Sequence, residues 1–397
     1  MVNYSVPRGY RFAASASGIK KSGKLDLGLI VSDQPARCAG VYTRNQVVAA
    51  PLQLTKDRLA AGQCQAILVN SGNANACTGA AGLDVARACG DLAARRLKID
   101  PQLIALASTG VIGQPLSLAP FERALPGLAE NLRTDGMAAV AEAMRTTDRY
   151  AKIASAQLEI AGHSCRIIGL AKGAGMIHPD MATMLAFVLT DAELAAPHLQ
   201  RLLSAAVKSS FNSITVDGDT STNDMVLLLA NGAAPGVAIL PESEAEALFV
   251  QELERVLLEL AKMIVRDGEG ATKVAEIQVC GAQSDAAARQ IARAVATSSL
   301  VKTAFFGEDA NWGRIIAAVG YAGVPIDPAL IDIYFDQVQV VRGGLFVGPE
   351  VEAPATAVLK QAEFCVRIDL HQAQGAARYY TSDLTYDYVK INADYRT

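Results

Sequence analysis

Short apolar runs bounded by Gly, Asn or Asp recur along the chain, and their length is typical of buried strands. They cover residues 66–70, 165–170, 184–190 and 225–230. Helical patterns lie between these runs. Thr190 and Glu193 form a capping box that predicts a helix over 191–208, and apolar side chains line one face of a second predicted helix over 242–265. This alternation predicts an α/β or mixed α+β fold.

The pattern changes after residue 275. Apolar and polar residues alternate over 333–340 and 364–370, as they do in half-buried antiparallel strands, and residues 286–300 have a helical pattern. We therefore expect a large N-terminal domain over 1–280 and a smaller C-terminal domain over 281–397. The linkers are short, so the two domains should pack together.

Composition and charge narrow the class of function. The 397 residues are 51% hydrophobic, which is enough to bury large cores, and 36 basic against 40 acidic residues give a net charge of −4. This balance argues against nucleic acid and against an anionic membrane face as partners. No apolar run reaches the ~18 residues of a membrane span, and the first 24 residues lack an export signal, so we expect a cytoplasmic protein.

The cysteines and histidines give no sign of a metal site or a disulfide framework. Seven cysteines form no C-x-x-C pair, and four histidines form neither H-E-x-x-H nor an i,i+4 pair. The run Asp217-Gly-Asp219-Thr-Ser221 resembles the start of a calcium loop, but Thr222 replaces the required Gly and Leu228 replaces the closing Glu. We expect no metal and no bound cofactor.

The segment from Lys172 to Thr190 concentrates chemically useful residues. A Gly-rich loop that carries Lys172, His178 and Asp180 runs into an apolar strand that begins at Thr183. Taken alone, this arrangement is typical of a turn before a strand, with Thr as a β-branched first residue. His178 and Asp180 have two open roles, because they can assist chemistry beside Thr183 or simply form and cap the turn.

Residues 172–187 resemble the self-cleavage signature of the ornithine acetyltransferase family, the glutamate N-acetyltransferases of arginine biosynthesis. Five further blocks are similar to blocks of that family and occur in the same order. They are N-S-G-N-A-N-A-C-T-G at 70–79, S-T-G-V-I-G at 108–113, D-G-D-T-S-T-N-D at 217–224, R-D-G-E-G-A-T-K at 266–273 and E-D-A-N-W-G-R at 308–314. The resemblance spans essentially the whole chain.

The resemblance implies a chain that cuts itself between Ala182 and Thr183, giving processed chains 1–182 (alpha) and 183–397 (beta). The chemistry of threonine agrees with that position. A Thr hydroxyl is a weak nucleophile, but an N-terminal Thr carries an α-amine of pKa about 7.7–8.0 that can take its proton. The implied reaction is a two-step transfer of the acetyl group from N-acetylornithine to glutamate through an acetyl-Thr183 intermediate.

The resemblance also implies a set of site residues. Thr109 and Gly110 match the catalytic donors that stabilise the oxyanion of each step. Lys172 suits the α-carboxylate of a substrate, and Glu269, in a short glycine-bounded loop, suits an amine or the orientation of the nucleophile. The positions that match substrate contacts are Thr146, Lys172, Thr183, Glu269, Asn392 and Thr397.

For the architecture, the resemblance implies a layered αββα sandwich as the catalytic domain, with a smaller C-terminal α/β domain. It implies that the alpha and beta fragments associate as a heterotetramer of two of each. The family contains enzymes that accept acetyl-CoA as a further substrate and enzymes that do not, and both types remain open. Two rival functions also remain: a self-processing N-terminal-nucleophile aminopeptidase or amidase of related fold, and a non-catalytic amino-acid-binding protein with an uncut chain.

Overall fold

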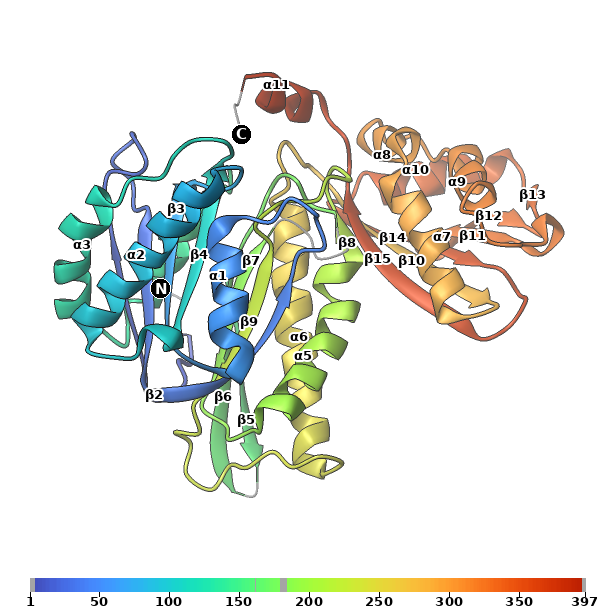
Figure 1. Ribbon diagram of the computed structural model, residues 1–397. Helices are drawn as coiled ribbons and strands as arrows, with labels where there is room; N and C mark the ends of the chain where they lie inside the picture. The colour runs from blue at the N-terminus through green and yellow to red at the C-terminus, as the bar shows by residue number, and fades with distance from the viewer. Residues whose placement is uncertain (1–3, 161, 179–183, 395–397) are drawn as a thin grey trace.

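The computed structural model describes residues 4–160, 162–178 and 184–394 (Figure 1). Two mixed sheets organise this part of the chain. The first sheet has the strand order β4-β3-β2-β9-β7-β6-β5, with β1 paired to β2. Its strands are β1 (Tyr10–Ser15), β2 (Leu27–Tyr42), β3 (Gln63–Asn73), β4 (Ile104–Val111), β5 (Lys152–Ile160), β6 (His163–Lys172), β7 (Leu185–Thr190) and β9 (Met225–Ala230).

The long strand β2 divides the first sheet into two layers. Residues 27–31 and 36–37 pair with β3, residues 37–42 pair with β9, and the register with β3 shifts between Val31 and Ala36. Such an irregularity bends a strand, and β2 thereby passes from the layer of β1, β3 and β4 into the layer of β9, β7, β6 and β5. The two layers share a core that includes Ile67, Phe187 and Leu227.

Helices cover the outer faces of both layers (Figure 1). α2 and α3 pack on the layer of β3 and β4, and α5 and α6 pack on the layer of β6, β7 and β9. The resulting order of layers confirms the expected αββα sandwich. No helix in the described ranges is long and apolar enough to cross a membrane. The helices of this part are α1 (Ala50–Arg58), α2 (Gly79–Leu97), α3 (Ala119–Glu130), α4 (Met137–Met144), α5 (Ala196–Ser209) and α6 (Glu244–Arg266).

Strand β7 lies at the centre of the second layer and is buried on both faces. Leu185, Phe187 and Leu189 contact the core between the layers, whereas Ala186 and Val188 contact the core beneath α5 and α6. Burial on both faces explains the uninterrupted apolar run in the sequence. Strands β7 and β9, which follow the expected cut, lie side by side between β6 and β2, which precede it, so one layer contains strands from both sides of the cut.

The second sheet forms the C-terminal part, with the order β13-β12-β11-β14-β10-β15-β8. Its strands are β8 (Ile214–Thr215), β10 (Val274–Ala282), β11 (Asp332–Phe335), β12 (Val338–Arg342), β13 (Leu345–Phe346), β14 (Glu363–Asp369) and β15 (Gly375–Ser382). The helices packed on it are α7 (Asp285–Thr297), α8 (Ser299–Phe306), α9 (Trp312–Gly320) and α10 (Glu352–Leu359). The domain boundary expected at residue 281 falls inside β10, and β8, which precedes it in the chain, pairs with β15.

One helix begins later than the sequence pattern indicates. Thr190 ends β7 and its hydroxyl accepts the N–H of Ala192 at 3.2 Å, so it caps no helix. Glu193 forms an isolated bridge with Ala238, and α5 begins only at Ala196. The capping-box prediction was wrong because Glu193 is held in extended backbone by a segment that follows 45 residues later in the chain.

Candidate active site

A small pocket of about 60 Å³ lies where the ends of β4 and β6 meet the segment that precedes β9. It brings together side chains from β4, from the segment after α4, from β6, from the loop after α6 and from α11 (Tyr386–Asp394). Six of the residues expected in the site line it, namely Thr109, Gly110, Thr146, Lys172, Glu269 and Asn392. Ala182, Thr183 and Thr397, like Asp180, lie outside the described residues.

Lys172 is the last residue of β6, and its side chain points into this pocket from a buried position. The residue is 4% exposed, and its Nζ donates to Thr109 Oγ1 at 3.1 Å. Burial lowers the pKa of Lys172, and the nearby carboxylate of Asp148 opposes that shift. The sequence pattern indicated a Gly-rich loop for Lys172, whereas the structure places it at the end of strand β6.

A buried charge network lies behind Lys172. Lys152, fully buried at the start of β5, donates to Asp148 Oδ1 at 2.7 Å and to Asp267 Oδ2 at 2.5 Å. Asp148 also accepts the N–H groups of Gly173 at 2.6 Å and of Thr146 at 2.9 Å. One buried cation therefore joins the segment of Thr146, the end of β6 and the loop that carries Glu269.

This network was not foreseen from the sequence. Lys152 opens a strand in which polar residues alternate with apolar ones, a pattern that usually places a lysine in solvent. Asp267 lies inside the block at 266–273, so it was within a recognised motif without an assigned role. Only that motif could have drawn attention to Asp267, because its partner Lys152 is 115 residues away in the chain.

Glu269 faces the pocket and links it to the C-terminal helix. Its Oε2 accepts from Asn392 Nδ2 at 2.9 Å, and its backbone N–H donates to Ala174 O at 3.0 Å. A Cβ added at Gly175 would lie 2.6 Å from the Glu269 carboxylate, so the glycine permits this close approach. Figure 1 shows that the chain after β15 leaves the second sheet and carries α11 toward the first part of the fold. The helix thereby delivers Asn392 to the pocket.

Gly110 lies in β4 at a point where β3 and β4 approach closely. Its φ is +132°, which only glycine adopts readily, and an added Cβ would lie 2.4 Å from the carbonyl carbon of Gly72. The pairing of β3 with β4 is irregular at Gly72 and Asn73. Glycine at position 110 is thus required by the backbone next to the pocket.

Asn223 is a further pocket residue that the sequence left without a role. Its side-chain amide donates to Ala74 O at 2.7 Å and to Ser108 O at 2.8 Å, and it is 7% exposed. It therefore ties the segment before β9 to β4, next to Thr109. Its position inside the block at 217–224 was the one signal that could have identified it.

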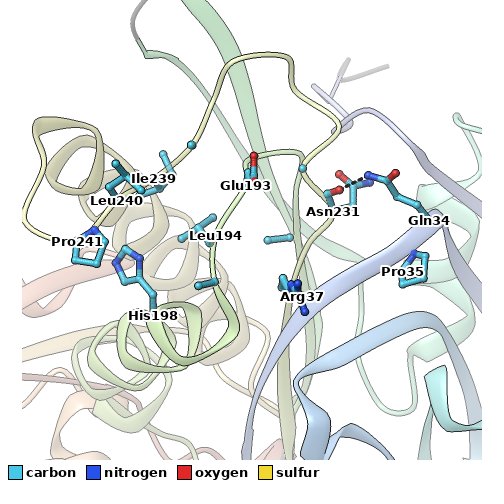
Figure 2. Close-up of a pocket in the computed structure, with 14 residues that line it drawn as sticks. Gln34, Pro35, Arg37, Glu193, Leu194, His198, Asn231, Ile239, Leu240 and Pro241 are labelled. Atoms are coloured by element: carbon cyan, nitrogen blue, oxygen red, sulfur yellow. Dashed lines mark hydrogen bonds between the residues drawn. The ribbon is translucent and has the colours of Figure 1, made fainter.

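A larger pocket of about 560 Å³ lies at the opposite end of β7 and β9 (Figure 2). Arg37, Glu193, His198 and Asn231 are among its lining residues, and none of the residues expected in the site is among them. His198 Nε2 lies 3.5 Å from Glu246 Oε2. Volume alone does not identify a reactive site, and the smaller pocket holds the convergent polar groups.

The small pocket combines one buried cation, one carboxylate and several uncharged donors. Lys172 can bind a carboxylate and Glu269 can bind an ammonium group. The Thr109 hydroxyl accepts from Lys172 and keeps its own proton to donate to a ligand. This combination fits a small molecule that carries both an acid and an amine. Within the described ranges, no group of three or more His, Cys, Asp or Glu side chains is placed to hold a metal ion.

Comparison with known proteins gives consistent matches. The model of the ArgJ family matches residues 11–397. The arginine biosynthesis bifunctional protein ArgJ of Syntrophotalea carbinolica is 61% identical over 391 residues, which are 98% of this chain and 99% of that protein. A crystal structure of the arginine biosynthesis bifunctional protein ArgJ from Bacillus halodurans is 46% identical with a TM-score of 0.51, and the match covers 53% of this chain and 98% of that chain. An ornithine acetyltransferase of Mycobacterium tuberculosis, complexed with ornithine, is 34% identical with a TM-score of 0.39 over 44% of this chain and 92% of that chain.

Proposed function

The chain belongs to the ArgJ family, and on that premise we propose that it transfers the acetyl group of N-acetylornithine to glutamate in arginine biosynthesis. The observation that carries the proposal is the convergence of Thr109, Lys172 and Glu269 on one pocket, from three segments distant in the sequence. N-acetylornithine offers an α-carboxylate for Lys172 and a cationic tail for Glu269. Glutamate offers the same carboxylate and an amine that can accept the acetyl group.

We propose that Thr183 is the nucleophile and that the chain first cuts itself before this residue. The Thr183 hydroxyl attacks the carbonyl carbon of Ala182, the C–N bond breaks, and the nitrogen takes the proton, which leaves an ester. Water then hydrolyses the ester and leaves the Ala182 carboxylate and a free α-amine on Thr183.

In the transfer itself, the free α-amine takes the proton of the Thr183 hydroxyl as the oxygen attacks the acetyl carbon. The proton passes to the leaving ornithine amine, and the acetyl group remains on Thr183 as an ester. The amine of glutamate then attacks that ester and restores the hydroxyl. Thr109 and Gly110 are proposed to donate to the oxyanion that forms in each half.

We propose N-acetylornithine, glutamate and the chain's own two fragments as the partners, with two copies of each fragment in a cytoplasmic heterotetramer and no separate cofactor. Acetyl-CoA is proposed as a second acetyl donor, because the matched relatives are named bifunctional. Measuring the acetylglutamate formed from acetyl-CoA and glutamate, without N-acetylornithine, tests that donor.

The rival hydrolase is tested with N-acetylornithine, with and without glutamate. A transferase makes ornithine and acetylglutamate in equal amounts, whereas a hydrolase releases acetate without glutamate.

Lys172→Met is expected to lower kcat/KM for both substrates about 10- to 150-fold, since a hydrogen bond to a charged group contributes about 1.5–3 kcal/mol. Glu269→Gln should raise KM for N-acetylornithine more than KM for glutamate, because only the first substrate carries a cationic tail. Steady-state kinetics with each substrate varied measures both effects. Lys208→Met removes an exposed lysine at the end of α5 and is the matched control. Equal changes in the two KM values would remove Glu269 from the tail-binding role.

Gly110→Ala is expected to lower kcat at least about 100-fold, the cost of losing one oxyanion donor. The physical reason is the 2.4 Å approach of a Cβ to Gly72, which forces the backbone at 110 to move. Gly127→Ala is the control, because a Cβ there meets no atom within 4 Å. A Gly110→Ala enzyme with unchanged kcat would show that this backbone does not contribute to the reaction.

A further inference from the structure

The loop that follows β6 is held by neighbouring segments along its described length. Ala174 O accepts from the backbone N–H of Glu269 at 3.0 Å, and Ile177 O accepts from the backbone N–H of Val216 at 2.8 Å. His178 O accepts from Thr220 Oγ1 at 3.3 Å. This loop leads directly to the expected cut, so its position decides how the chain enters that region.

The carboxylate of Asp217 holds the turn of this loop. Its Oδ2 accepts the N–H of Met176 at 2.6 Å, and its Oδ1 accepts the N–H groups of Ile177 at 2.8 Å and of Asp219 at 3.2 Å. Met176 has a φ of +52°, a left-handed conformation that is unfavourable for a residue with a Cβ. Consecutive N–H groups in such a turn form a concave anion site, and Asp217 fills it.

Asp224 makes the corresponding contact on the other side of the expected cut. It is 1% exposed, and its Oδ1 accepts the N–H of Met184 at 2.9 Å. Met184 O in turn accepts from the N–H of Met225 at 3.1 Å, which begins the pairing of β7 with β9. Among the described residues, the other oxygen, Oδ2, has no hydrogen-bond partner. Asp224 thus fixes the chain immediately before β7.

We propose that Asp217 and Asp224 are positioning residues for self-cleavage, which hold the chain at Ile177 and at Met184 on either side of the expected cut. The inference rests on the proposed function, because it presupposes cleavage before Thr183. Both aspartates belong to the block at 217–224, so one short segment binds the chain on both sides of the expected cut. Fixing the ends lowers the conformational entropy that must be lost before the hydroxyl reaches the carbonyl.

The two aspartates accept different numbers of N–H groups, and this difference makes the role testable. Asp217 uses both oxygens, so Asn at 217 loses one acceptor. Asp224 holds the N–H of Met184 through Oδ1 alone, so Asn at 224 keeps this contact. Burial raises the pKa of Asp224, and a protonated carboxyl also accepts through Oδ1. A role in proton transfer would instead make both Asn variants inactive.

The test follows cleavage of freshly synthesised full-length chain over time on denaturing gels. The reaction is run at pH 8, because burial raises the pKa of Asp217 to about 6. We expect Asp217→Asn to slow cleavage at least tenfold, Asp224→Ala to slow it at least tenfold, and Asp224→Asn to recover most of the lost rate. Asp219→Asn, an identical change at an exposed carboxylate in the same turn, should cleave like the wild type.

A second variant separates positioning from loss of folding. Met176→Gly in the Asp217→Asn background should restore cleavage at least threefold, because glycine adopts the left-handed turn without a carboxylate to hold it. Cleavage of Asp217→Asn at the wild-type rate would overturn the inference, and so would equal losses in Asp224→Asn and Asp224→Ala, or no rescue by Met176→Gly. A wild-type chain that stays uncut would overturn the proposed function itself, which distinguishes the two failures.

Discussion

Thr183→Ala is expected to give one intact chain of 397 residues with no measurable acetyl transfer. The wild type should instead give two fragments of 182 and 215 residues, about 19 and 23 kDa in proportion to the 41.7 kDa of the whole chain. Alanine removes the oxygen that attacks the peptide bond and later carries the acetyl group, so one change abolishes both reactions. A denaturing gel, N-terminal sequencing of the larger fragment and a transfer assay measure the three expectations.

Thr183→Ser and Thr134→Ala are the comparisons for that experiment. Serine keeps an attacking oxygen, so slow cleavage and weak transfer should remain, whereas Thr134 is exposed and does not line the small pocket. If the wild type transfers acetyl groups as a single polypeptide, or if the second fragment begins at another residue, then Thr183 is not the nucleophile.

Lys152→Met is expected to destabilise the protein by about 3–5 kcal/mol, because two buried carboxylates lose the cation that they share. Among the described residues, Asp267 then keeps only its ion pair with Arg149 Nε at 3.0 Å. Both carboxylates on Lys152, those of Asp148 and Asp267, have fully buried side chains. Burial alone would raise the pKa of Asp148, but Lys172 and Lys152 hold it below its usual range. The loss should appear as a lower midpoint in urea, measured in the uncut Thr183→Ala chain so that no fragment dissociates.

Two further variants show whether charge is the cause. Adding Asp267→Asn to Lys152→Met should recover part of the lost stability, because it removes one of the two buried carboxylates that Lys152 neutralised. Lys208→Met, at an exposed position, should change stability by no more than about 0.5 kcal/mol. A loss below about 1 kcal/mol in Lys152→Met would show that the network contributes little to folding.

The apolar runs predicted the central strands well, since a strand buried on both faces leaves few alternatives. The runs at 184–190 and 225–230 correspond to β7 and β9, and the ordered layers match the architecture that the family resemblance implies. Positions of chain segments relative to one another were harder to predict. The pairing of Glu193 with Ala238 displaced a helix start that local sequence favoured, because tertiary contacts outweigh a propensity of a fraction of a kcal/mol.

In the candidate site, too, the residues that belong to local motifs were predicted, and those that depend on distant contacts were not. Thr109, Lys172 and Glu269 were found through motifs, and they line one pocket. Lys152 and Asp217 were given no role. The carboxylate of Asp267 that binds Lys152 is 115 residues away in the chain, and Asp217 binds backbone N–H groups, which a motif of side chains does not reveal. The partial calcium pattern at Asp217 had a different cause, since the carboxylate there binds backbone N–H groups.

The mixing of strands from both sides of the proposed cut in the layer of β2, β9, β7 and β6 affects how each molecule folds and refolds. β7 and β9 lie in the proposed beta chain, whereas β6 and the C-terminal half of β2 that pairs with β9 lie in the alpha chain. Before the cut, these strands find one another at the high local concentration that a single chain provides. After the cut, recovery from unfolding is a second-order encounter between two chains, so its yield should fall with dilution. Each molecule would therefore fold efficiently as a single-chain precursor, and afterwards its activity would depend on the two fragments remaining associated.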